Sequence, residues 1–185
     1  AATLQGRVVR RNREELVGLV APARAPAEVS ASLERVAGRG WGASILTGEA
    51  LALVGAHEHL PGVLDLDDVT VLCLATHEEA FLDAVLLSTT PANAAARLAL
   101  WLQVVRGSVP ACAGGALIAP GLAAWVTGDG ALQVVCLQAL RGRVAPADWV
   151  DFLDAVNAEC VEPAAWPALR EAFEADRQVT DEAVG

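Results

Sequence analysis

The sequence predicts an all-α fold, a bundle or short superhelix of eight to nine helices arranged as antiparallel, tetratricopeptide-like hairpins. Signals that start and stop helices recur at short intervals, which favours short connections and antiparallel neighbours. Apolar residues also recur at helical spacing, most clearly at Leu98, Trp101, Leu102 and Val105. The only strand candidate is the short segment 4–9, because β-branched alternation is absent elsewhere.

Capping signals define the first two expected helices. Asn12 and Glu15 have the spacing of a capping box, so a helix should begin directly after Asn12 and end before Pro22. Proline is favoured in the first turn of a helix, where its missing N–H is not needed. Pro26 should therefore open the second helix, which Gly38 ends.

The segment 41–60 is apolar but has poor helical periodicity. We expect it to be helical with a break near Gly48, and to stop at Pro61. An aspartate, either Asp65 or Asp67, should cap the helix that follows.

Two further signals divide the middle of the chain. Thr76 and Glu79 have capping-box spacing, which predicts a new helix after Thr76. Thr90 precedes Pro91, which is the order expected for a cap followed by a proline at the first helical position. The helix that opens there should end at Gly107.

The uncharged run 107–128 is long enough to cross a bilayer, but it holds five glycines and two prolines. We interpret it as a buried core segment with a helix over about 116–127, which Pro120 should kink or delay. The Gly114-Gly115 pair indicates a helix start or a close approach of another backbone segment.

The C-terminal third should contain three more helices. A tight turn at 128–130 precedes the first of them, with Asp129 as its cap. Prolines mark the starts of the last two expected helices, 146–159 and 163–177. We expect one helical domain over residues 1–185, with 1–10 as an extended arm and 179–185 as a frayed tail.

The net charge of −10 argues against nucleic-acid binding, which needs a basic surface to neutralise phosphates. The charge is uneven, because residues 1–13 carry four arginines and no acid. That basic arm is either a solvated terminus or a segment that docks on an anionic partner or on the acidic body of the protein. No signal peptide is visible, and we expect no membrane partner.

The cysteines give the expected compartment. The chain has four of them and no CxxC pair, all in apolar surroundings. Buried free thiols are typical of proteins in a reducing environment, so we expect a cytoplasmic protein. Cys73 and His77 have the spacing of one helix face, but the new helix expected at Thr76 disfavours a catalytic thiol–imidazole pair.

Residues 124–131 read AWVTGDGA, an alanine-rich helix that ends in tryptophan and is followed by a Gly-Asp-Gly turn. This stretch is similar to the most recognisable part of an actinobacterial family called domain of unknown function 4192. The segments 6–22, 83–86 and 162–166 also resemble it. The resemblance implies that this chain is the helical C-terminal part of a longer protein with an N-terminal portion containing strands. It implies no activity, cofactor or catalytic residue.

Three histidines are the candidates for metal binding. His57 and His59 lie near acidic residues, and His77 precedes two glutamates. Imidazole and carboxylate suit zinc, manganese or iron, but the HExxH spacing is absent, and solvated side chains at a helix end are the simpler interpretation. The chain has no lysine, so the Gly-Asp-Gly turn is not a phosphate loop, and we expect no cofactor.

These observations favour a helical protein-interaction or scaffold module without catalytic activity. Its partner would be another protein or the missing N-terminal portion. Most of the five tryptophans should be core residues, but Trp149 and Trp166 stand at acidic, proline-marked helix starts and are candidates for a partner-binding surface. The alternatives are a metal-dependent enzyme that uses His57, His59 and His77, and a homodimer that buries its apolar excess between subunits.

Overall fold

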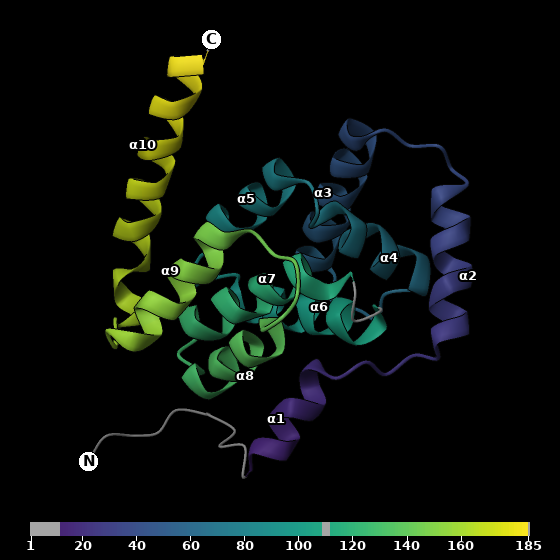
Figure 1. Cartoon of the computed structure of the whole chain (residues 1–185), viewed down its shortest axis with the longest axis horizontal. Coiled ribbons are helices and arrows are strands. Elements are labelled where there is room, and N and C mark those ends of the chain that lie inside the picture. The colour runs from purple at the N-terminus through teal and green to yellow at the C-terminus, as the bar shows by residue number, and fades with distance from the viewer. Residues whose placement is uncertain (1–11, 109–111, 185) are drawn as a thin grey trace.

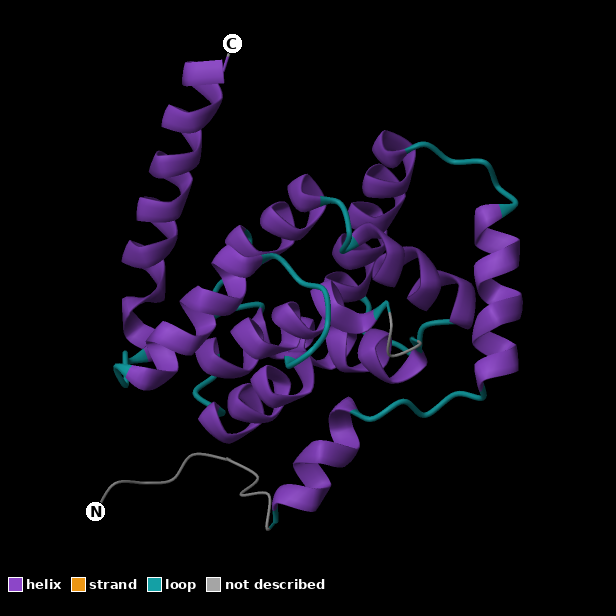
Figure 2. Cartoon of the chain, viewed as in Figure 1, coloured by secondary structure: helices purple, strands orange, loops and turns teal. Residues whose placement is uncertain are grey.

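The structure, a computed structural model, describes residues 12–108 and 112–184, with side chains up to residue 175. All regular structure in this part of the chain is helical, as Figure 2 shows. It consists of one short 3-10 turn at Pro163–Ala165 and ten α-helices (Figure 1): α1 Arg13–Val20, α2 Pro26–Ala37, α3 Ala43–His59, α4 Leu66–Ala75, α5 Glu79–Leu87, α6 Ala94–Gly107, α7 Ala113–Val126, α8 Gly130–Leu140, α9 Ala147–Ala158 and α10 Trp166–Val184.

The predicted all-α class is confirmed, with ten α-helices among the described residues instead of eight to nine. Several helices begin where their capping residues predicted. Asn12 accepts a hydrogen bond from the Glu15 backbone N–H at 2.9 Å, and Pro26 is the first residue of α2. Asp65 is the cap of α4, and Asp129 is the cap of α8. The strand candidate 4–9 and the arm 1–10 lie outside the described residues.

Three local expectations were wrong. α3 continues through Gly48 without a break, because one exposed glycine costs a helix little when the rest of the segment packs. The Thr76 hydroxyl donates to the Cys73 carbonyl at 2.7 Å, so Thr76 ends α4 and does not cap α5. The helix expected to open at Pro91 begins at Ala94, after a turn in which the side chains of Thr90 and Asn93 each accept from the other's backbone N–H.

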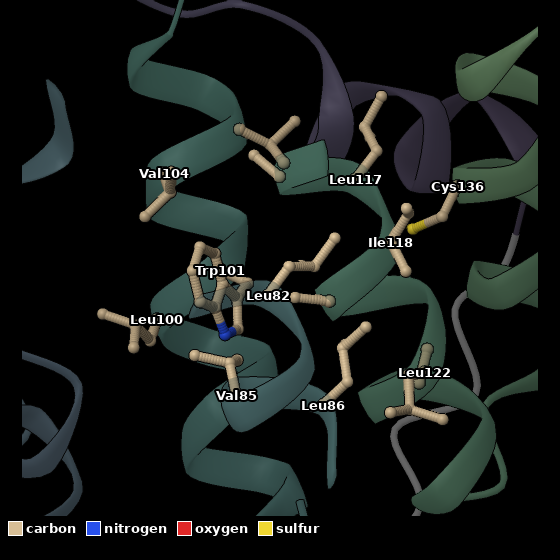
Figure 3. Packing of buried hydrophobic residues seen from close by; sticks show 14 of the residues in the cluster. Leu82, Val85, Leu86, Leu100, Trp101, Val104, Leu117, Ile118, Leu122 and Cys136 are labelled. Carbon is tan, nitrogen blue, oxygen red and sulfur yellow. The ribbon is translucent and has the colours of Figure 1, made fainter. Parts of the chain in front are cut away.

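The central element is α7, which packs against α4, α5, α6, α8 and α9. All fourteen of its residues are buried, and eight of them are alanine or glycine. Figure 3 shows Leu117, Ile118 and Leu122 of α7 among side chains from α5, α6 and α8. The part of the uncharged run that forms α7 was therefore correctly interpreted as core, and α7 continues through Pro120 as one helix. Small side chains allow neighbouring helices to approach closely on every side.

Two glycines at the start of α7 lie against backbone from other segments. A Cβ atom on Gly114 would stand 1.9 Å from the carbonyl oxygen of Val144, and one on Gly115 would stand 2.5 Å from that of Thr76. No side chain can occupy either place without movement of a backbone segment. Both interpretations of the glycine pair are therefore correct, since it lies at a helix start and also permits close backbone approach.

An aromatic cluster attaches α9 and α10 to the body of the protein. Trp149 stacks on Phe173 with ring centroids 5.1 Å apart, and Trp125 of α7 meets Trp166 edge-on at 6.0 Å. Phe152 lies between them and contacts all four rings. Together these five side chains join α7, α9 and α10 through a large apolar contact.

A buried arginine connects α3, α5 and α6. The guanidinium of Arg97 pairs with Glu58 of α3 and donates to the Val85 carbonyl of α5. It also donates to the hydroxyl oxygens of Ser88 at 2.9 Å and Thr89 at 3.3 Å. A buried guanidinium is costly unless it is fully hydrogen-bonded, so these partners fix the position of the three helices relative to one another.

The glycine contact on α7 yields a stability prediction. Gly114→Ala should lower the free energy of unfolding by about 1–3 kcal/mol or more, because the Val144 carbonyl must be displaced. Gly48→Ala is the matched control, since no atom lies within 4 Å of the added Cβ. It should be neutral or stabilise α3 by up to about 1 kcal/mol. Urea unfolding followed by circular dichroism measures both, and equal effects would contradict the packing described for Gly114.

Candidate binding groove

A groove of about 410 Å³ opens at the C-terminal end of α6. Leu66 and Val69 of α4 contribute apolar surface to it, and the linker between α1 and α2 and the loop between α3 and α4 form its walls. The volume falls within the range of sites that hold small ligands or segments of other proteins. Nine residues line the groove: Ala23, Arg24, Val63, Leu64, Leu66, Val69, Gln103, Arg106 and Gly107.

The last turns of α6 hold both walls in place. Gln103 donates to the Gly62 carbonyl at 3.0 Å and accepts from the Leu64 N–H at 3.0 Å, which fixes the loop after α3. On the other side, the Ala23 N–H donates to the Arg106 carbonyl at 2.7 Å, which satisfies one of the free carbonyls at the end of α6. Both walls are therefore anchored to one rigid helix.

The side of the groove lined by Val69 and Gly107 depends on a close approach of α6 to α4. A Cβ atom on Gly107 would stand 2.7 Å from the Val69 side chain, so only glycine permits this approach. The sequence predicts Gly107 only as a helix end. Its second role, as the contact point with α4, depends on a residue 38 positions earlier and has no local signal.

The groove has basic side chains and no acidic one. Arg24 and Arg106 are exposed, and neither guanidinium forms an ion pair or hydrogen bond within the described part of the chain. The nearby acid Asp67 is held by Arg35 and Arg39 of the α2 region instead. In a chain with a net charge of −10, this leaves a local positive site beside apolar surface.

A polar clasp between α2 and α4 positions the linker wall. The Ser32 hydroxyl is buried and lies 2.6 Å from Asp67 Oδ1 and 2.8 Å from the Thr70 hydroxyl. Arg35 Nη2 donates to Asp67 Oδ1 at 2.6 Å. The guanidinium of Arg35, together with Ser32, lowers the pKa of Asp67 to about 2.

A second hollow of about 280 Å³ lies beside α8 and α9. It is lined by both signs of charge, with Arg141 and Arg143 facing the same space as Asp151 and Asp154. Mixed charge selects neither an anionic nor a cationic partner, so the groove beside α6 has the more specific chemistry.

The three histidines occupy different environments. His57 is buried near the end of α3, His59 is exposed at its last position, and His77 is exposed in the turn between α4 and α5. Within residues 12–108 and 112–175, the structure assembles no group of three or more histidine, cysteine or acidic side chains that could hold a metal ion. Glu58, between the first two histidines, is instead the partner of Arg97.

The two candidate surface tryptophans are core residues. Trp149 and Trp166 are each 1% exposed, so both lie in the core of the single chain. Trp149 Nε1 donates to Asp83 at 2.7 Å, and Trp166 Nε1 donates to the Thr89 carbonyl at 2.7 Å. Both indoles point into the core because each N–H has an acceptor there. Asp83 of α5 accepts from Trp149, and the Thr89 carbonyl just after α5 accepts from Trp166.

The candidate thiol–imidazole pair is also separated. Cys73 is buried, and burial raises the pKa of its thiol to about 12, whereas His77 is exposed beyond the end of α4. The Cys73 thiol donates to the Cys112 carbonyl at 3.3 Å. A thiol held in its neutral form is a poor nucleophile, so this cysteine is a packing residue.

The groove arginines were not identified in the sequence analysis. Arg24 lies in a short Ala- and Pro-rich linker and Arg106 in a helix end, where arginine is common for local reasons. Both line the groove because the linker before α2 is hydrogen-bonded to the end of α6, from the Ala23 N–H to the Arg106 carbonyl, and this long-range contact has no local sequence signal. No helix in the described residues is both long and apolar enough to cross a membrane.

Comparison with known proteins gives one match. The sequence pattern of a family described as Domain of unknown function (DUF4192) matches residues 1–146. The groove, the clasp and the whole of α7 fall within the matched range, whereas α9 and α10 follow it. The tail 162–166, which resembled the same family, therefore lies beyond the match. No curated protein and no solved structure matches the chain.

The polar clasp between α2 and α4 predicts that the free energy of unfolding decreases in acid. Because the folded-state pKa of Asp67 lies below the ordinary value of 3.8, the carboxylate contributes stability above about pH 4 and loses it as the pH falls toward 2. The difference in unfolding free energy between wild type and Asp67→Asn should therefore shrink over that interval. In an Arg35→Met variant, the free energy of unfolding should lose most of this dependence on pH, because Arg35 is the main cause of the lowered Asp67 pKa. A constant difference from pH 5 to about 2 would contradict this account of the clasp.

Proposed function

Since the chain belongs to the DUF4192 family, which is defined without a known function, we propose from the geometry that it is a non-catalytic module that binds a segment of another protein. The observation that carries this proposal is the groove beside α6, in which apolar side chains lie next to Arg24 and Arg106. A segment with apolar and acidic side chains would satisfy both features.

The rigidity of the groove supports binding. Its walls are fixed to α6 through Gln103 and through the carbonyl of Arg106, so little conformational freedom is lost when a partner enters. Its arginines need not leave an existing ion pair before they contact a partner. Both properties raise affinity without enlarging the contact area.

Exposed apolar residues concentrate beside the groove and on the helix before it. Val63 lines the groove and is 90% exposed, and Leu60 in the same loop is 83% exposed. Ile45 and Leu51 on α3 are also exposed. Exposed apolar side chains grouped in one part of a chain are typical of binding surfaces, and here two of them belong to the loop that forms one wall of the groove.

The test compares partner capture by matched variants. The wild-type chain, an Arg24→Glu/Arg106→Glu variant and an Arg141→Glu control are each immobilised and incubated with lysate of the source cell, and bound proteins are quantified by mass spectrometry. We expect a saturable partner that the groove variant loses by about tenfold or more, as reversal of contacting charges does. The control reverses an exposed arginine of the other hollow and should retain the partner.

Thermal unfolding of each variant accompanies the capture, since the exposed arginines should not affect folding. A partner that all three proteins capture equally would contradict the groove as the binding site. Absence of any saturable partner would contradict the proposed function.

A further inference from the structure

We infer that one occupant of the groove is the C-terminal helix α10 of a second copy of this chain. This inference rests on the proposed function, because it assigns a partner to the same groove. Two structural features carry it: a helix that projects from the body, and a groove whose chemistry complements that helix.

The first turns of α10 pack against the body. Trp166 and Phe173 belong to the aromatic cluster, whereas Glu174 and Ala175 are exposed. Figure 1 shows the distal part of α10 extending away from the other helices. The helix continues to Val184. A projecting helix of this length is available to a partner.

The sequence of the distal part has the pattern that the groove requires. Residues 174–184 contain four acids and one arginine. In the sequence, Ala, Val and Ala at positions 175, 179 and 183 recur at the four-residue spacing of an amphipathic helix, and acids stand at positions 176 and 182. An acidic sequence with apolar residues at helical spacing complements a groove in which apolar surface lies next to arginines.

The arrangement of the molecule requires a second copy. In Figure 1, α10 lies on one side of the body, whereas α2 and the linker before it lie on the opposite side. The groove is formed by that linker together with α4 and α6. Because α10 cannot reach the groove of its own chain, docking joins two molecules. Such an interface either closes reciprocally into a dimer or continues head to tail.

Sedimentation equilibrium of the 185-residue chain, from low to several hundred micromolar, tests the inference. The wild type should associate reversibly. Arg24→Glu/Arg106→Glu in the groove and Asp176→Arg/Glu182→Arg on α10 should each weaken association by about tenfold or more. The protein carrying all four substitutions should associate again with nearly wild-type strength, since the charges are then exchanged. Arg141→Glu should leave association unchanged.

A wild-type chain that stays monomeric at every concentration would overturn the inference, as would association that the groove substitutions leave intact. The groove variant and the α10 variant could both lose association while the combined variant fails to recover it. That result would mean that the two surfaces do not meet, and it would also overturn the inference. If the chain is monomeric but the groove variant still loses its partner from lysate, this inference fails and the proposed function stands. If neither self-association nor a groove-dependent partner is observed, both fail.

Discussion

The burial of α7 on all sides is the constraint on which the rest of the structure depends. A helix can be surrounded by five others only if its own side chains are small, and eight of the fourteen residues of α7 are alanine or glycine. Close contact also requires that the surrounding backbone approach without collision, which Gly114 and Gly115 allow. The surrounding helices add large side chains to the core, such as Phe81 of α5 and Trp101 of α6, whose rings meet edge-on 6.3 Å apart.

Helix boundaries were predictable wherever the determining contact was local. Asn12, Pro26 and Asp129 act within three residues of their own position, so their patterns predicted the starts of α1, α2 and α8. Thr76 was misinterpreted because a threonine can bond forward as an N-cap or backward to the preceding turn, and the choice depends on what packs beside it. The break expected near Gly48 failed for a similar reason, since helix propensity is weaker than packing.

The binding groove could not be predicted from the sequence, although the residues that form it are ordinary. Its arginines are more than 80 positions apart, and they line one groove because the linker that carries Arg24 is hydrogen-bonded to the end of α6, from the Ala23 N–H to the Arg106 carbonyl. Polar groups at or beside the candidate residues make internal contacts. Glu58, placed between two histidines, neutralises Arg97, and the indoles of Trp149 and Trp166 donate inward to α5. Chemistry-bearing residues in an α-helical core are often needed to satisfy one another.

The aromatic cluster has a consequence for where this protein can be divided. The family match ends at residue 146, before the helices that supply Trp149, Phe152 and Trp166. Without those rings, Trp125 would lose its aromatic neighbours, and Leu153, which stands 3.2 Å from the place that a Cβ on Gly121 would take, would be removed with α9. Evolutionary and physical boundaries therefore differ here. We expect the autonomous folding unit to include α9 and the start of α10, and a fragment cut at the family boundary to expose an apolar face and aggregate.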